Sequence, residues 1–285
     1  MKMKNYIVVI FISILSFILI AISGSSLNDT ITKISQQDLK DSTKSIDIDT
    51  LRKRSNTAFD AGEYLKFDVN YGFVTAGEAI LKIKDTVYNN RKCHLVEFTL
   101  SSKPFFDVFY KVRDRYSTLI DAEGVFPWRF EQHVREGGYT RDFIAEFDQI
   151  NHIARTTNGE FKIPPYVHDI MSAFYYSRTI DYSNLKQGQK IRLQNFYKDS
   201  TYQLDVKFKG RQETDVNAGI FNCVVIEPLV KEGGLFKSEG RIIVWLSDDD
   251  RKIPVLVTAK IVIGSVNAEL VGYHGIVGQI NSKIK

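Results

Sequence analysis

Apolar and polar residues alternate through Leu65-Lys66-Phe67-Asp68-Val69-Asn70-Tyr71. Because successive side chains of a β-strand point to opposite faces, this alternation predicts a strand with one buried face. The same period of two recurs along the chain and predicts about a dozen strands. They are expected near residues 65–71, 79–84, 96–100, 106–116, 128–135, 139–147, 191–197, 202–208, 221–227, 241–246, 255–263 and 268–273.

Turn signals separate many of these runs, such as Asn89-Asn90, Gly137-Gly138 and Asn158-Gly159. Short strands joined by tight turns predict an antiparallel meander. Each strand has an apolar face that must be buried on the sheet itself, on another sheet or on a helix. We therefore expect residues 59–285 to form one mainly β domain, an antiparallel curved sheet or half-barrel.

One segment breaks the strand pattern. After Pro164-Pro165, the run Val167–Asp181 places Ile170, Met171, Phe174 and Tyr175 at helical spacing. Proline is tolerated at the start of a helix, where its missing N–H has no partner to lose. The pattern predicts one helix, with its apolar stripe packed on the concave side of the sheet.

The N-terminus has the features of a secretory signal peptide over residues 1–23. Lys2 and Lys4 precede the apolar run Ile7–Ile22, and Ala21-Ile22-Ser23 offers a small-x-small cleavage pattern. The alternative is an uncleaved anchor, because the run is nearly long enough to span a bilayer. We expect a periplasmic or secreted protein, touching the membrane only through this segment before cleavage. Residues 24–58 are mostly polar and predict a flexible spacer.

The charge balance argues against nucleic acid as a partner. Removing residues 1–23 takes away two lysines, so the net charge falls from +4 to about +2. The mature chain shows no basic stripe, zinc-finger spacing or recognition-helix pattern.

The two cysteines, Cys93 and Cys223, stand far apart in two strand-like runs. An oxidising compartment allows a disulfide, provided that the fold brings the two Cα atoms within about 7 Å. The alternative is two separate buried thiols.

Two charges are predicted on apolar faces. Asp114 shares the face of Val112 and Tyr116 in the strand expected over 106–116. Arg178 follows Phe174 by four residues in the expected helix and lies beside its apolar stripe. A buried charge needs a partner, so a buried Asp114–Arg178 ion pair is one hypothesis; each side chain reaching solvent at an edge is the other.

Aromatic residues cluster within residues 105–110, 126–130 and 174–176, which predicts either an apolar ligand cavity or an ordinary core. The candidates for lining such a cavity are Phe106, Val108, Tyr110, Met171, Phe174 and Tyr175.

Catalytic and cofactor motifs are missing from the sequence. There is no nucleophile elbow, zinc-protease helix motif, phosphate loop or dinucleotide fingerprint. The five histidines are scattered without metal-ligand spacing, and Asp248-Asp249-Asp250 has the wrong spacing for a calcium loop. We expect no enzyme, no cofactor and no metal.

Several stretches resemble a family of exported bacterial proteins, the domain-of-unknown-function family numbered 3108. The resemblance spans residues 59–274. Its main matches are Phe59-Asp60-Ala61-Gly62-Glu63-Tyr64-Leu65, residues 111–116, residues 169–178 and residues 244–255. The closing Trp245-Leu246-Ser247-Asp248 and Ile253-Pro254-Val255 also resemble periplasmic lipoprotein carriers of the LolA and LolB type. That second resemblance implies a half-barrel with helices across its open side.

Three functions follow from these observations. The first is a non-enzymatic binder of a lipid or another apolar ligand in the cell envelope. The second is a structural or interaction module that contacts envelope proteins. The third is a glycan-acting enzyme with dispersed carboxylates, which needs two of them about 5–10 Å apart in one cleft.

Overall fold

A computed structural model describes residues 51–285 except 233–234, 237–241 and 261–263. Fifteen strands form one antiparallel sheet, and fourteen of them follow one path, β8-β7-β6-β5-β4-β3-β2-β1-β15-β14-β13-β11-β10-β9, with β12 paired to β11. The predicted fold class is confirmed. The strands are β1 Tyr64–Tyr71, β2 Val74–Tyr88, β3 Arg91–Ser102, β4 Arg113–Asp121, β5 Pro127–Glu136, β6 Tyr139–Asp148, β7 Ile153–Thr156, β8 Gly159–Lys162, β9 Lys190–Tyr197, β10 Ser200–Val216, β11 Gly219–Glu232, β12 Leu235–Phe236, β13 Ile242–Ser247, β14 Pro254–Lys260 and β15 Ser265–His274.

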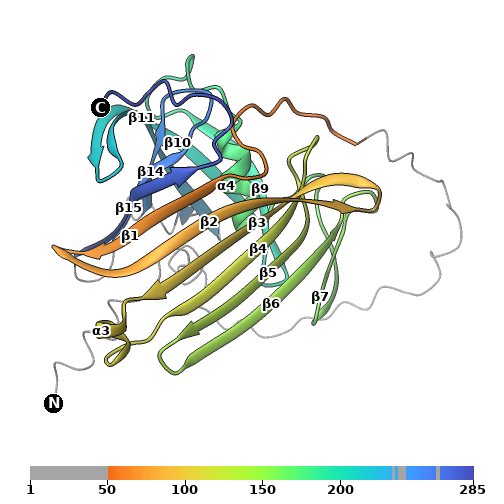
Figure 1. Ribbon diagram of the computed structural model, residues 1–285. Coiled ribbons are helices and arrows are strands. Elements are labelled where there is room, and N and C mark those ends of the chain that lie inside the picture. The colour runs from red at the N-terminus through yellow and green to blue at the C-terminus, as the bar shows by residue number, and fades with distance from the viewer. Residues whose placement is uncertain (1–50, 233–234, 237–241, 261–263) are drawn as a thin grey trace, which may run out of the picture.

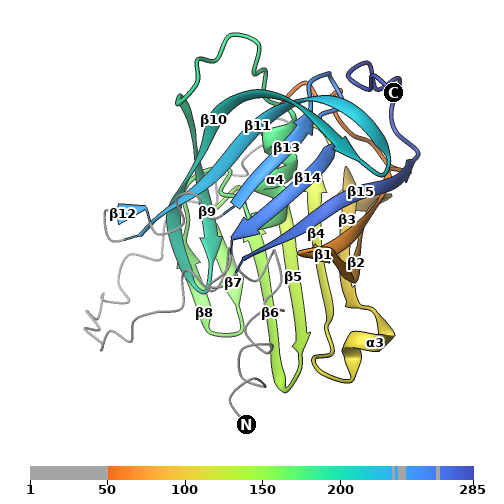
Figure 2. The same ribbon diagram turned by 90° about the vertical axis from the view of Figure 1, so that its left-hand side faces the viewer.

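The sheet curls until its two edge strands, β8 and β9, approach each other (Figures 1 and 2). Side chains join this seam: the Thr156 hydroxyl donates to Asp199 over 2.7 Å, and the Phe147 and Phe196 rings meet edge to face at 5.9 Å. The apolar faces of the strands therefore bury one another inside the curve. The short hairpin of β7 and β8 was not among the predicted strands.

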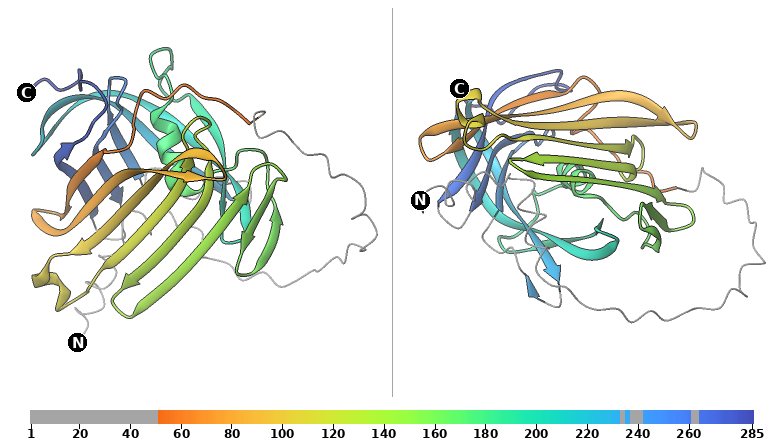
Figure 3. Two further views of the ribbon diagram at one scale, coloured as in Figure 1. Left: turned by 45° about the vertical axis from the view of Figure 1, so that its right-hand side comes forward. Right: turned by 90° about the horizontal axis from the view of Figure 1, so that it is seen from below.

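Helix α4, Ile170–Arg178, lies inside the curve, as the view from below in Figure 3 shows. It contacts β4 and β9, and all its residues except Phe174 and Tyr176 are buried. It begins later than predicted, because the cap is Asp169 rather than the prolines. The Asp169 carboxylate accepts from the N–H groups of Met171 and Ser172, and the Ser172 hydroxyl accepts from the N–H of Asp169, which completes a capping box.

The strand predicted over residues 106–116 is wrong in its first half. Residues 104–107 form the short helix α3, Pro104–Asp107, and β4 begins only at Arg113. Proline at the first helical position favours this turn. Asp107 fixes it by accepting from Ser102 and from Arg113, whose Nη2 lies 2.5 Å away.

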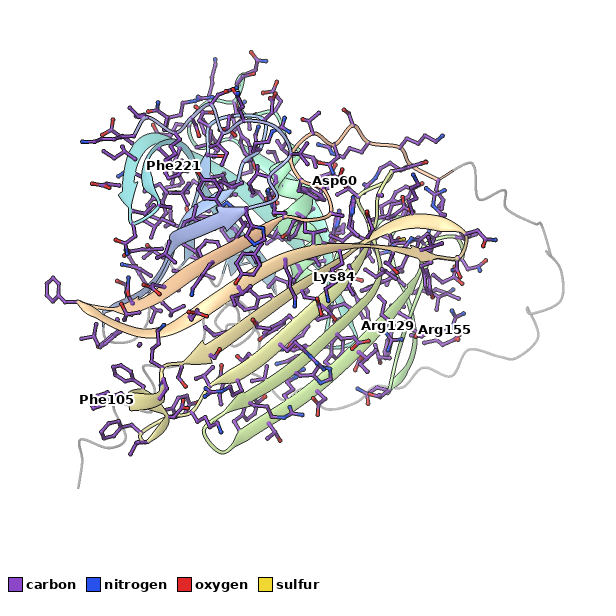
Figure 4. The ribbon with its side chains drawn as sticks, viewed as in Figure 1. Asp60, Lys84, Phe105, Arg129, Arg155 and Phe221 are labelled. Carbon is purple, nitrogen blue, oxygen red and sulfur yellow. The ribbon has the colours of Figure 1, made fainter. Side chains whose placement is uncertain are left out.

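The curled sheet, which we call the barrel although β8 and β9 are not paired, has two unlike ends. We call the end with the turns between β1 and β2, β3 and β4, and β5 and β6 the rim; it carries α3. We call the other the helix end, since α4 and the start of β1 lie there. Figure 4 shows Phe105 at the rim and Asp60 at the helix end.

The compact domain starts earlier than the predicted boundary at Phe59. Residues 51–58 lie against the barrel, with Leu51 and Ala58 buried. The predicted signal peptide and the spacer up to residue 50 lie outside the described residues. Neither α3 nor α4, the helices of the described part, is long and apolar enough to cross a membrane.

Candidate functional site

The candidate site is an apolar cavity between α4 and the inner face of the sheet. From α4 it is lined by Ile170, Met171, Ala173, Phe174, Tyr175 and Ser177. The strands contribute the rest of the wall: Phe67, Val69, Ala79, Leu81, Phe98, Leu100, Leu204, Val206, Ile226, Pro228, Ile242, Val244, Pro254, Val257 and Ala268.

The cavity has almost no polar surface to offer a ligand. No charged side chain or histidine is among the described residues that line it. The Tyr175 hydroxyl, one of its few polar groups, is turned to Glu63 at 3.4 Å. Burial, and then Glu63, raise the pKa of Tyr175 well above its ordinary value, so this group stays neutral. The site can exclude water and hold hydrocarbon, but it offers no acid or base.

The cavity volume is about 130 Å³. That is close to the ~150 Å³ of an engineered cavity that binds benzene. Several lining residues, such as Leu100, Leu204 and Ala268, lie close to the rim ends of their strands. The space therefore reaches from α4 toward the rim.

The predicted lining residues divide into two groups. Met171, Phe174 and Tyr175 line the cavity. Phe106, Val108 and Tyr110 do not, because the segment that carries them leaves the sheet. Val108 is 82% exposed, and Tyr110 is buried beneath the rim against Gly137, where a Cβ would lie 2.6 Å from its ring.

Arg178 forms a fully buried ion pair, but its partner is Glu63 and not Asp114. The two carboxylate oxygens of Glu63 accept from Nη1 and Nη2, each over 2.6 Å. Nη2 also donates to the backbone carbonyls of Ala58 and Arg251. Burial alone would lower the pKa of Arg178, but Glu63 offsets it and keeps that pKa above its ordinary value. The pair ties the end of α4 to β1 and to the β13–β14 turn.

Asp114 is buried as predicted, yet it stands at the rim, far from Arg178 at the helix end. Its carboxylate accepts from the backbone N–H of Arg135 over 2.9 Å. The prediction of an Asp114–Arg178 pair is wrong because alternation reports only the face of a residue. The position along the barrel axis depends on which end of the strand it occupies.

Glu63 was missed, although the sequence carried a signal for it. Glu63 has the same parity as Leu65, Phe67 and Val69, so alternation places its side chain on the buried face. The same reasoning that selected Asp114 could have selected Glu63.

A second buried polar cluster surrounds the start of α4. The Asp169 carboxylate accepts from the Thr118 hydroxyl over 2.7 Å, and the backbone of His168 pairs with β9. His168 is fully buried; burial, with Arg52 and Arg54 nearby, lowers its pKa to about 3. Arg54 also donates to the carbonyl of Thr179 over 3.0 Å. The N-terminal segment thus holds the C-terminal end of α4.

Cys93 and Cys223 are free, buried thiols, so of the two alternatives the structure has the separate thiols and not the disulfide. Five strands of the sheet separate β3 from β11, and the two residues belong to different apolar clusters. Burial raises the pKa of Cys93 to about 12 and that of Cys223 to about 11, which keeps both thiols protonated.

Asp60, Asp85 and His94 are the group that comes nearest to a metal site in the described part of the chain. Asp60 lies 3.7 Å from Nε2 of His94, while Asp85 lies 3.7 Å from Nδ1. The two carboxylates therefore face opposite nitrogens of one imidazole. The two carboxylates are therefore better placed to interact with the histidine ring itself than to bind one metal ion together with it.

A family model for a protein of unknown function, DUF3108, matches residues 66–271. The chain belongs to this family. No curated protein matches the sequence.

Two solved structures are similar to this member of the DUF3108 family. One is a β-barrel-like protein of the DUF1849 family from Brucella abortus, with a TM-score of 0.52, 9% identity, and coverage of 74% of this chain and 96% of that one. It supports the barrel-like fold. The other, from Bacteroides fragilis, is described as a "putative exported protein" with a YmcC-like fold; its TM-score is 0.33, with 8% identity and coverage of 79% and 99%. None of these comparisons tests the resemblance to lipoprotein carriers.

Proposed function

We propose that this protein is an exported, non-enzymatic binder of an apolar ligand, with lipid hydrocarbon in the cavity beside α4. The observation that carries the proposal is the cavity wall itself, which is almost wholly hydrocarbon. Each Å² of apolar ligand surface buried against this wall stabilises the complex by about 25 cal/mol. A polar ligand would lose its hydrogen bonds to water and find no partners in the wall.

The size of the cavity favours a chain-shaped ligand. A space of about 130 Å³ holds part of an acyl chain, and the wall continues toward the rim. Phe174 is the half-buried member of the helix wall and is the side chain best placed to move as a ligand enters.

The cavity does not support the glycan-acting alternative. General acid and base chemistry on a glycan needs two carboxylates in one cleft, whereas no carboxylate is among the described lining residues. Export is part of the proposal and is supported by the signal-peptide pattern of residues 1–23.

Native mass spectrometry of protein purified from its own cell envelope tests this function. We expect an adduct with the mass of a lipid, lost in Ala79→Leu, which fills the cavity, and kept in Val87→Ser, an exposed position at the helix end. Displacement of a bound apolar dye by a fatty acid is the second readout. No adduct and no displacement would refute lipid binding, and a stable protein partner found instead would favour an interaction module.

A further inference from the structure

The rim carries an unusual group of exposed apolar side chains. Phe105 is 72% exposed, Val108 82% and Phe109 58%, all between β3 and β4. The neighbouring β1–β2 turn adds Phe73 and Val74, which are fully and half exposed. Lone exposed apolar residues are ordinary, but several at one edge mark an interaction site.

The two turns lie side by side. β2 and β3 are paired up to Gly77 and Ser102, and the N–H of Lys103 donates to the carbonyl of Ala76 over 2.9 Å. Figure 4 shows Phe105 projecting from α3, away from the sheet. The apolar side chains thus form the tips of adjacent loops and do not line a groove.

The α3 loop is held in place by hydrogen bonds and by the packing of Tyr110. Asp107 is bound by Ser102 and Arg113, and Tyr110 is buried under the segment. The N–H of Gly137 donates to the carbonyl of Lys111 over 2.8 Å, which pins the far end of the loop. The exposure of the three apolar residues is therefore a property of a fixed loop. Phe105 and Phe109 meet edge to face at 6.0 Å, but both rings remain largely exposed.

The charges beside the apolar tips indicate which kind of partner this surface binds. Segment 103–113 contains Lys103, Lys111 and Arg113 against one acid, Asp107, which pairs with Arg113. Lys103 is paired with an acid of the neighbouring strand, since its Nζ lies 3.5 Å from the Glu78 carboxylate. Lys111 follows the apolar tips and is exposed, which makes it the cation of this segment best placed to meet a lipid headgroup. Apolar side chains that enter the acyl region beside lysines at headgroup level are the arrangement that binds an anionic bilayer.

We propose that the rim loops, residues 72–74 and 103–113, are a membrane-docking surface for a bilayer containing anionic lipids. Docking there turns the rim side of the cavity toward the membrane and leaves the helix end away from it. The surface exists whether or not the cavity holds lipid, so this inference and the proposed function can fail separately.

One experiment places an environment-sensitive nitrobenzoxadiazole label at either end of the full chain, in Val108→Cys or in Val87→Cys. Val87 is 69% exposed and stands near the β2–β3 turn, which makes it the matched control. The two native thiols are buried and do not compete for label. The labelled proteins are mixed with vesicles of phosphatidylethanolamine and phosphatidylglycerol, or of phosphatidylcholine alone.

We expect a blue-shifted, brighter signal from position 108 with the anionic vesicles and no change from position 87. Phe105→Ser with Phe109→Ser in the labelled Val108→Cys chain should weaken this response at least tenfold. Lys111→Gln should weaken it about fivefold on anionic vesicles only. The contrast between positions remains valid even if the N-terminal segment tethers the chain.

Three outcomes would overturn the proposal. One is no response at position 108 with either vesicle, and another is an equal response at both positions. The third is a response at position 108 that grows with protein concentration without vesicles, which would assign the surface to a second copy of the chain.

Discussion

The two ends of the barrel place charge and hydrocarbon in opposite ways. At the helix end, Arg178 and Glu63 are fully buried among apolar residues. At the rim, Phe105 and Val108 stand in solvent while Asp107 and Arg113 hold the loop beneath them. The buried charges fix the position of α4, whereas the exposed apolar side chains bury little surface within the protein. We infer that the residues of the helix end stabilise the fold, whereas the exposed residues of the rim contact a partner outside the protein.

The largest expected effect comes from Glu63→Gln. Removing this charge leaves the buried guanidinium of Arg178 without a countercharge, which costs about 3–5 kcal/mol of unfolding free energy. Urea unfolding followed by circular dichroism measures the loss. Asp142→Asn, in the exposed pair with Arg135 near the rim, is the control and should leave the midpoint nearly unchanged. Similar losses in the two variants would contradict the contrast between the ends.

The next effect is a pH dependence that His168 imposes on stability. Its pKa in the folded chain is about 3, below the ordinary value of 6.5, so the unfolded chain takes up the proton first. Above pH 6.5 the histidine is neutral in both states and does not lower the unfolding free energy. Below pH 6.5 the unfolding free energy falls by about 1.4 kcal/mol per pH unit. Between pH 6.5 and 5 the loss is about 2 kcal/mol.

His168→Gln should remove this part of the pH dependence, as measured by urea unfolding at each pH. The exposed His152→Asn variant serves as the control. An unchanged slope in His168→Gln would show that the histidine reaches water in the folded protein.

A smaller effect is expected for the cap of α4. Asp169→Ala frees the N–H groups of Met171 and Ser172 and should cost about 1–2 kcal/mol. Asp169→Asn keeps an acceptor at the cap and should restore most of the loss. Thermal unfolding of the parent protein and the two variants ranks their stabilities. If the asparagine variant is no better than alanine, the charge rather than the cap is what matters.

The smallest effect is expected at the rim. Phe105→Ser and Phe109→Ser should each change the unfolding free energy by less than about 0.5 kcal/mol, because little contact is lost. Urea unfolding without vesicles measures this. A loss above about 1.5 kcal/mol for either would mean that these rings pack within the protein, and the comparison of the two ends would fail.

Local sequence patterns predicted the environment of some residues correctly and of others wrongly. Leu65, Phe67 and Val69 were correctly assigned to the buried face, and Met171, Phe174 and Tyr175 to the apolar face of a helix that lines the cavity. Val108 was placed on a buried face and is exposed, because Pro104 and Asp107 turn the chain away from the sheet.

The sequence by itself determined the class of fold, since alternation is a local property that each strand carries independently of its neighbours. It also placed Cys93 in a strand-like run and Arg178 beside the apolar stripe of the helix, and left the burial of Arg178 open. Only the tertiary structure decided their partners. Glu63 meets Arg178, and Cys93 stays away from Cys223, because strand order and the length of each strand set positions around and along the barrel. Those positions depend on residues that are distant in the chain, and no local pattern records them.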